Sequence, residues 1–296
     1  MADSTDAATE SQQGKASRSA SADRESNPDS DGPSAGSATS GALLSLRSIS
    51  KHFGPVTALD GVDLEVPAGR VTALLGDNGA GKSTLIKVIA GIHEADHGEI
   101  RWNGERVHIR TPHDATTLGI ATVYQDLALC DNLDIVANMF LGAETRRHGM
   151  LNETPMELTA RETLAGLSVT SVRSIRQPVG SLSGGQRQSV AVARAVMGDA
   201  KLVIMDEPTA ALGVSQTAMV LELIERLAAG GIAVLVISHN LNDVFAVADR
   251  VAILHLGRLV HSGPASDYDR QSAVEIMTTG VLSARENGVH DTAART

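Results

Sequence analysis

Aromatic residues and cysteine are scarce in this chain. Of its 296 residues, three are Phe, two are Tyr and one is Trp, so any core must be built from Leu, Ile, Val, Ala and Met. The single cysteine, Cys130, has no second cysteine with which to form a disulfide inside the chain, which fits a reducing compartment. We interpret Cys130 as a small hydrophobic side chain.

Long hydrophobic runs and an excess of positive charge are also missing. The longest apolar run, residues 232–237, has six residues, whereas a membrane-spanning helix needs about 20. We therefore expect that the chain does not cross a bilayer by itself. No segment near its start combines basic and apolar residues, so no secretory signal is predicted. The net charge of −10 and the isoelectric point near 5.4 argue against a general nucleic-acid-binding surface.

The composition changes sharply near residue 41. Residues 1–41 are mostly Ser, Ala, Asp and Gly, with no aromatic and almost no large aliphatic residue. Such a segment buries too little apolar surface to offset its ordering entropy, so we predict a disordered tail. The folded domain is predicted to cover residues 42–281, and residues 282–296 are predicted to be a flexible C-terminal tail.

A complete phosphate-binding loop lies at residues 76–84, with the sequence Gly-Asp-Asn-Gly-Ala-Gly-Lys-Ser-Thr. Residues 71–75 are predicted to form a buried strand before it, and residues 84–90 a helix after it, which is the context that the motif requires. Glycines let backbone N–H groups approach phosphate oxygens, and the helix start adds the positive end of its dipole. We expect Lys82 to reach the β- and γ-phosphates and the Ser83 hydroxyl to bind Mg²⁺.

Apolar runs and helical patterns alternate through the rest of the chain. Strands are predicted near residues 120–124, 202–205, 232–237 and 251–254, separated by amphipathic helices. Alternating runs at 43–49 and 62–66 and a hairpin turn at Asn103–Gly104 indicate antiparallel strands. The predicted fold is therefore α/β, of the P-loop NTPase (RecA-like) class: a mostly parallel sheet with an antiparallel β subdomain. A helical pattern over residues 131–179 predicts an inserted helical subdomain at about 127–183.

Polar residues follow several of the predicted parallel strands. Asp206 is placed to hold Mg²⁺ through water, and Glu207 to polarise a water for attack on the γ-phosphate as a general base. His239 follows a neighbouring strand and could contact the γ-phosphate, and Gln125 offers an oxygen to Mg²⁺ or to the attacking water. Because the carboxyl ends of parallel strands share one sheet edge, we expect these residues to gather beside Gly76.

Two further features remain open from the residues alone. Leu182-Ser-Gly-Gly-Gln186 opens a helix and makes a second anion site, yet one compact domain has no obvious second phosphate to place there. The simplest resolution is that it completes the site of another copy of the chain. Phe53 lies in a polar segment bounded by Gly and Pro, and it either stacks on a flat ligand ring or is an ordinary surface aromatic.

Taken in order, these motifs resemble the ATP-binding subunits of ABC transporters, over about residues 43–262. The resemblance implies a dimer that encloses two ATP molecules, each between the phosphate loop of one domain and the Ser-Gly-Gly segment of the other. Dimer closure then drives a membrane permease, and hydrolysis resets it. The implied cofactors are ATP and Mg²⁺, with Ser83, Gln125 and Asp206 on the metal and Glu207, His239 and Gln125 in catalysis. The implied ATP contacts are Phe53 on the adenine, Gly76, Asp77, Asn78, Gly79, Ala80, Gly81, Lys82, Ser83, Thr84, Ser183, Gly184, Gly185 and Gln186.

Residues 129–142 and 207–214 are similar to the branch that energises uptake of monosaccharides such as ribose, xylose or fructose. The implied partners are an integral-membrane permease and an extracytoplasmic sugar-binding protein, with the chain peripheral to the cytoplasmic face of the membrane. Gly213 stands where many relatives carry aspartate, which leaves communication between the two sites open. Many members of the branch fuse two domains, so this single domain is expected to form a homodimer or to pair with a related subunit.

Two other functions stay open. One is a soluble ABC protein acting on DNA or ribosomes, and the other is an ABC ATPase for export or for a substrate other than a sugar. Soluble members usually show long coiled-coil insertions, paired domains or basic patches, none of which is evident in the sequence. No nucleic-acid partner is therefore expected.

Overall fold

A six-stranded sheet forms the centre of the protein, whose computed structural model describes residues 41–169 and 172–281. Its neighbouring strands run parallel, except that the edge strand β12 is antiparallel to β11. The prediction of a mostly parallel sheet is therefore confirmed. In spatial order the strands are β12 (Arg258–Pro264), β11 (Arg250–His255), β3 (Val71–Leu75), β10 (Ala233–Ile237), β9 (Leu202–Asp206) and β6 (Ile120–Val123).

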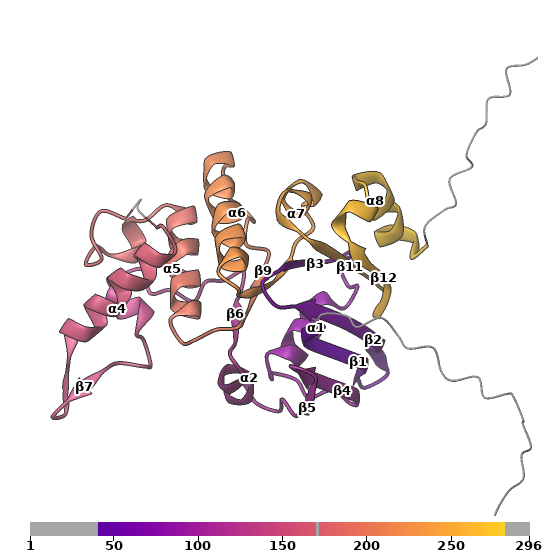
Figure 1. Ribbon diagram of the computed structural model, residues 1–296, viewed down its shortest axis with the longest axis horizontal. Coiled ribbons are helices and arrows are strands. Elements are labelled where there is room, and N and C mark those ends of the chain that lie inside the picture. Colours follow the sequence, from indigo (N-terminus) through magenta and orange to yellow (C-terminus); the bar gives the residue numbers. More distant parts are fainter. Residues whose placement is uncertain (1–40, 170–171, 282–296) are drawn as a thin grey trace, which may run out of the picture. The chain divides into compact units, whose positions relative to one another are not determined.

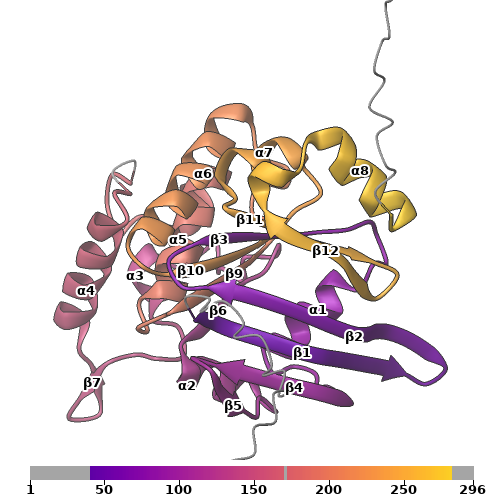
Figure 2. The same ribbon diagram turned by 45° about the vertical axis from the view of Figure 1, so that its right-hand side comes forward.

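Both faces of this sheet are buried, by different layers. In β9, Leu202 and Ile204 pack in one core cluster and Val203 and Met205 in another. This alternation explains why the strands are continuous apolar runs rather than alternating ones. Figures 1 and 2 place the helices α6, α7 and α8 on one side of the sheet and the antiparallel sheet on the other. The three helices are α6 (Val214–Ala229), α7 (Leu241–Val247) and α8 (Arg270–Thr279).

The antiparallel sheet has four strands, in the order β2 (Val56–Pro67), β1 (Ala42–Phe53), β4 (His97–Trp102) and β5 (Glu105–Val107). The hairpin turn predicted at Asn103–Gly104 is confirmed, and both residues have the left-handed φ that such a turn needs. The strand predicted at 62–66 in fact starts at Val56. Register shifts in the β1–β2 pair let it continue through the irregular stretch before Val62, which the alternation of the sequence did not indicate.

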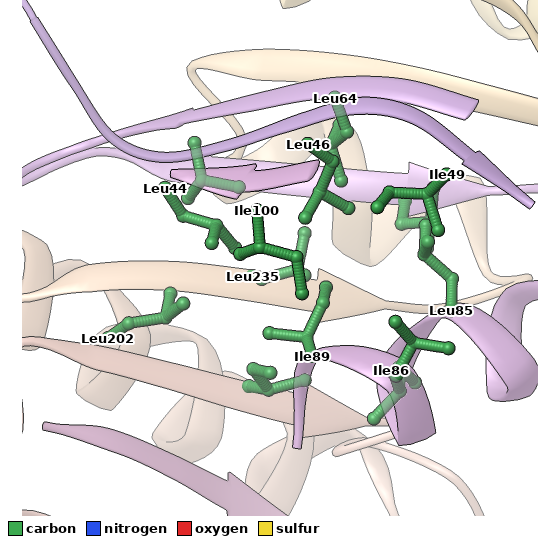
Figure 3. Packing of buried hydrophobic residues seen from close by; sticks show 14 of the residues in the cluster. Leu44, Leu46, Ile49, Leu64, Leu85, Ile86, Ile89, Ile100, Leu202 and Leu235 are labelled. Carbon is green, nitrogen blue, oxygen red and sulfur yellow. The ribbon is translucent and has the colours of Figure 1, made fainter. Parts of the chain in front are cut away.

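Helix α1 (Lys82–Ile89) lies between the two sheets. Its apolar residues Leu85, Ile86 and Ile89 are at most 1% exposed and pack with Leu46 and Leu235 in one cluster. Figure 3 shows these side chains gathered in one group below the strands of the antiparallel sheet. The helix that follows the phosphate-binding loop is therefore fixed from both sides, which holds its first turn at the edge of the parallel sheet.

The segment predicted to be an inserted helical subdomain contains α3 (Ile135–Met139), α4 (Glu153–Gly166) and η1 (Val179–Ser181). It also contains a small hairpin, β7 (Arg146–Arg147) and β8 (Met150–Leu151), so the prediction of a helical pattern throughout 131–179 was wrong here. The hairpin turns at His148–Gly149, where φ is 53° and 81°. Left-handed backbone at two successive residues cannot continue a helix. The boundaries of the subdomain stay a prediction.

Helices α2 (Pro112–Leu118) and α5 (Gly184–Val196) complete the helical elements that bear on the site, and η2 (Ala265–Asp267) precedes α8. Cys130 is partly buried and carries a free thiol. Among residues 41–169 and 172–281, no helix has both the length and the apolar character needed to span a bilayer. The tails predicted at 1–41 and 282–296 lie outside the described residues, apart from Gly41.

Candidate functional site

The phosphate-binding loop follows β3 directly and runs into α1. Gly81 precedes α1 with φ of 105°, and Gly76 follows β3 with φ of 154°. A Cβ atom on Gly81 would lie 2.7 Å from the carbonyl oxygen of Ala58, and one on Gly76 would lie 2.4 Å from that of Leu254. The loop is therefore pressed against β2 on one side and β11 on the other, and only glycine fits at either contact.

Lys82 is held over this loop by the loop itself. Its Nζ donates to the carbonyl oxygen of Gly76 over 2.7 Å and to that of Asp77 over 3.0 Å. The loop and the start of β2 enclose a cavity of about 270 Å³. Backbone N–H groups at a helix start, a lysine and three hydroxyls suit a polyphosphate. The cavity is lined by Val56, Thr57, Ala58, Asn78, Gly79, Ala80, Gly81, Lys82, Ser83 and Thr84.

Gly81→Ala is expected to lower the free energy of unfolding by about 1–3 kcal/mol, because the methyl group meets backbone and the left-handed φ is strained for alanine. Urea unfolding followed by circular dichroism measures the change. Gly198→Ala is the matched control, since a Cβ on Gly198 would meet no atom within 4 Å and should leave stability nearly unchanged. Equal stability of the two variants would contradict the close contact at Ala58.

The two candidate carboxylates, Asp206 and Glu207, lie at the end of β9. Asp206 is its last residue and pairs with Ile237 of β10, which lies between β9 and β3. Burial raises the pKa of Asp206 above its usual value, and the neighbouring Glu207 raises it further, while Lys82 and Lys87 oppose both effects. Because β9, β10 and β3 are parallel neighbours, the end of β9 and the phosphate-binding loop lie at the same edge of the sheet.

Asp206→Asn is expected to raise the melting temperature at pH 7, while it lowers ATP hydrolysis. The raised pKa means that the folded protein binds this proton more readily than the unfolded chain, so ionised Asp206 destabilises the fold. This destabilisation by ionised Asp206 decreases as the pH falls through the pKa of Asp206 in the folded protein. The gain in melting temperature of the variant should therefore decrease towards pH 4. Calorimetry at both pH values tests this, and a variant less stable at pH 7 would contradict it.

Glu207 and His239 form a contact across neighbouring strands. The Nδ1 atom of His239 lies 2.8 Å from Oε1 of Glu207, and the Glu207 N–H donates to the carbonyl oxygen of Ile237 over 2.8 Å. The Glu207 side chain is 17% exposed whereas that of His239 is 72% exposed. Glu207 has a φ of 50°, which is uncommon for a residue other than glycine and is typical of functional sites. One oxygen of the carboxylate is thus fixed by an imidazole at the sheet edge.

Gln125 belongs to the same edge. Val123 of β6 pairs with Met205 of β9, so the chain beyond β6 runs alongside Asp206 and Glu207. Gln125 is exposed there. The structure therefore brings the phosphate-binding loop, Gln125, the carboxylate pair and His239 to the carboxyl ends of four parallel strands, where ligands bind in such sheets.

The Ser-Gly-Gly segment lies at the start of α5, and its position is set by contacts with α6 rather than by a strand of the sheet. Ser183 caps α5: its hydroxyl accepts from the Gln186 N–H over 3.3 Å, and the Gln186 amide oxygen accepts from the Ser183 N–H over 3.0 Å. A Cβ on Gly184 would lie 2.7 Å from Leu212, and one on Gly185 would lie 3.2 Å from Gln216. The glycines therefore allow α5 to approach the start of α6. None of the residues 183–186 lines the phosphate cavity.

Phe53 ends β1, and it is 44% exposed. It pairs across the hairpin with Val56, which lines the cavity. Residues 56–58, which line the cavity, were not among the predicted site residues. A signal for them was the closeness of this stretch to Phe53 across the Gly54–Pro55 turn.

Gly213 stands at the start of α6 without a side-chain cap. Its φ of −75° is accessible to any residue, and a Cβ there would meet no atom within 4 Å. The fold therefore does not require glycine at this position, and an aspartate would fit.

Comparisons with known proteins agree with this geometry. The family described as "ABC transporter" matches residues 59–210. A xylose/arabinose import ATP-binding protein from Sulfolobus acidocaldarius is 45% identical over 240 residues, which cover 81% of this chain and 95% of that protein. A fructose import ATP-binding protein from Rhizobium meliloti is 46% identical over 251 residues, covering 82% of this chain and 96% of that protein. The ribose import ATP-binding protein RbsA 2 of Escherichia coli O157:H7 is 39% identical, and the match covers 49% of it.

Solved structures lead to the same family. The ATP-binding cassette MJ1267 of an ABC transporter superposes with a TM-score of 0.71 at 28% identity, covering 79% of this chain and 96% of that one. Its ADP conformation gives a TM-score of 0.70 at 27% identity, covering 81% and 96%. Family match, identity over whole relatives and fold agree, so this chain belongs to the ABC transporter family as an ATP-binding, ATP-hydrolysing subunit.

Proposed function

We propose that this chain binds and hydrolyses ATP to energise the import of a monosaccharide through a membrane permease. The observation that carries the proposal is the 45–46% identity to two sugar-import subunits over 95–96% of their length. Those proteins are named for xylose or arabinose and for fructose, so a monosaccharide is the class they share. The site at the sheet edge supplies the groups that ATP hydrolysis needs.

In this proposal the side chains of the site have defined tasks. Lys82 and the loop N–H groups bind the β- and γ-phosphates, and Phe53 stacks on the adenine. Glu207 is the general base, oriented by its 2.8 Å contact with His239, whose exposed ring is free to approach the γ-phosphate. Gln125 places the attacking water.

We further propose that Mg²⁺ accompanies the nucleotide. The residues suited to it are Ser83 and Asp206, with Gln125 as a third oxygen donor. Within residues 41–169 and 172–281, no group of three or more His, Cys, Asp or Glu side chains is arranged to hold a metal ion. The metal would therefore take its other ligands from phosphate oxygens and water, which is how Mg²⁺ is usually held beside a nucleotide.

The Ser-Gly-Gly segment is proposed to complete the ATP site of a partner ATPase, either a second copy or a related subunit. Residues 183–185 open the 13-residue helix α5, which favours an anion at its start, yet they do not line the phosphate cavity of their own chain. The N–H groups of a helix start that is held rigidly by α6 would suit the γ-phosphate bound by another chain.

The permease is proposed to dock at a cavity of about 370 Å³ beside Gln125. Tyr124, Asp126 and Leu127 flank Gln125 and line this cavity together with residues of α2 and α5. A segment seated there would touch the loop that carries a catalytic side chain, which links transport to hydrolysis. In this proposal the chain lies at the cytoplasmic face of the membrane, and a sugar-binding protein works on the other side.

Affinity purification from gently solubilised native membranes, with cross-linking and mass spectrometry, tests the proposal. We expect a multi-span permease cross-linked near residues 124–128, together with a sugar-binding protein. Recovery of ribosomes or DNA-repair factors without a membrane partner would move the chain to the soluble branch. Recovery of a permease with a binding protein for another solute would retain the transport function and reject the sugar.

A further inference from the structure

The loop after α1 folds back onto the end of β1. Ile92 and His93 both donate their N–H groups to the carbonyl oxygen of Lys87, over 2.8 and 3.1 Å. At the other end of the loop, the N–H of Asp96 donates to the carbonyl oxygen of Ser50 over 2.9 Å. The loop is therefore pinned to α1 at one end and to β1 at the other, just before Phe53.

Asp96 binds the residues that precede Phe53. Its Oδ1 accepts from Lys51 Nζ over 2.7 Å, and its Oδ2 accepts from the backbone N–H of His52 over 2.6 Å. The His52 ring nitrogen Nδ1 also lies 3.3 Å from Oδ2. These contacts, led by Lys51, lower the pKa of Asp96 to about 2, so the carboxylate stays ionised at any physiological pH. Lys51 and the backbone of β1 are thus held in one arrangement.

The ring of Phe53 is contacted from two directions. The ring of His93 meets it edge to face, with centroids 5.2 Å apart and planes at 71°. The Lys51 ammonium lies 5.6 Å from the Phe53 centroid, within the range of a cation–π contact. Yet Phe53 remains 44% exposed, at the rim of the phosphate cavity through its partner Val56. An exposed aromatic ring held by two neighbours is an oriented surface rather than a freely rotating side chain.

We propose that His93 and Lys51, with Asp96 holding Lys51, are positioning residues that orient Phe53 as a platform for a purine base. The inference rests on the proposed function, because it requires a nucleotide in the phosphate cavity. The platform lowers the ordering cost of binding, since the ring is already fixed before the base arrives. Helix α1 then contributes to binding at both ends of the nucleotide. Its first turn faces the phosphates, and the loop after its last turn orients the ring on which the base stacks.

The test is nucleotide binding by His93→Ala and His93→Phe in the full chain. Losing the ring contact of His93 should raise the Kd and KM for ATP about three- to tenfold, with kcat unchanged. His93→Phe keeps an aromatic ring beside Phe53 and should restore both constants. Affinity for inorganic triphosphate, which has no base, should be equal in all variants. The matched control is His113→Ala on the exposed surface of α2, which should bind ATP as the unmodified protein does.

The possible results separate the platform from the proposed function. If the unmodified protein binds ATP and His93→Ala binds it equally well, the platform is wrong and the ATPase function stands. If His93→Ala weakens ATP and inorganic triphosphate alike, the residue supports the loop rather than the base, and the inference is again overturned. If the unmodified protein does not bind ATP, both the inference and the proposed function fail. Loss confined to ATP, with rescue by phenylalanine, supports the platform.

Discussion

Replacing Glu207 with glutamine is expected to lower the rate of ATP hydrolysis by about 10²- to 10⁴-fold while ATP still binds. The amide keeps the size of the side chain and can still contact His239, but it cannot accept a proton from the attacking water. Because the phosphate-binding groups of the loop are untouched, the ATP-bound dimer should accumulate. Steady-state phosphate release measures the first effect, and size-exclusion chromatography with ATP measures the second.

Glu225→Gln is the matched control for this substitution, because Glu225 is an exposed glutamate on α6, remote in sequence from every strand end of the site. It should hydrolyse ATP at the unmodified rate. Normal steady-state hydrolysis by Glu207→Gln would show that another group activates the water. Loss of ATP binding in that variant would indicate that the left-handed backbone at Glu207 had collapsed, and would leave the assignment as base without support.

Lys82→Ala is expected to weaken ATP binding about 10- to 100-fold, since the ammonium makes charge-assisted hydrogen bonds to the phosphates. A second effect acts in the same direction. Lys82 also holds the carbonyl groups of Gly76 and Asp77, so its loss loosens the loop before the nucleotide arrives. Removing its charge should also raise the pKa of Asp206 further, because Lys82 is one of two lysines that lower it. Titration calorimetry with ATP gives the affinity.

Lys201→Ala removes an exposed lysine that lies just before β9 and outside the phosphate cavity, and it should leave ATP affinity unchanged. Equal ATP affinity of Lys82→Ala and the unmodified protein would place the phosphates elsewhere. A drop in both variants would point to the overall charge of the protein rather than to the loop. The same calorimetry with inorganic triphosphate separates the phosphate contribution from that of the base.

The chemistry of the site could be predicted from the sequence because each of its parts is local. The phosphate-binding loop needs only glycines at fixed offsets, a following helix and one lysine, all within residues 76–84. The helix start at Ser183 likewise depends on a side chain three residues away. Buried parallel strands are recognisable in the sequence as short apolar runs. The polar residues that follow these runs could therefore be assigned to one edge of the sheet.

Other features could not be predicted because the sequence carries little local sign of them. The small hairpin at Arg146–Leu151 interrupts a segment whose apolar spacing is helical on both sides, and only its His148–Gly149 turn departs from that pattern. The start of β2 at Val56 depends on register shifts against β1. Both depend on cross-strand pairing, which the periodicity of a single segment does not record.

The sequence by itself determined the α/β class, the phosphate-binding loop and the candidate residues of the site, because these follow from short-range patterns of glycine, charge and apolar runs. Only the tertiary structure decided how the residues meet. The Glu207–His239 contact joins positions 32 residues apart, and the contacts of Asp96 and His93 with β1 span about 40. The physical reason is that strand order and the layer on each face are set by packing of the whole core, which fixes distances between residues that are remote in the chain.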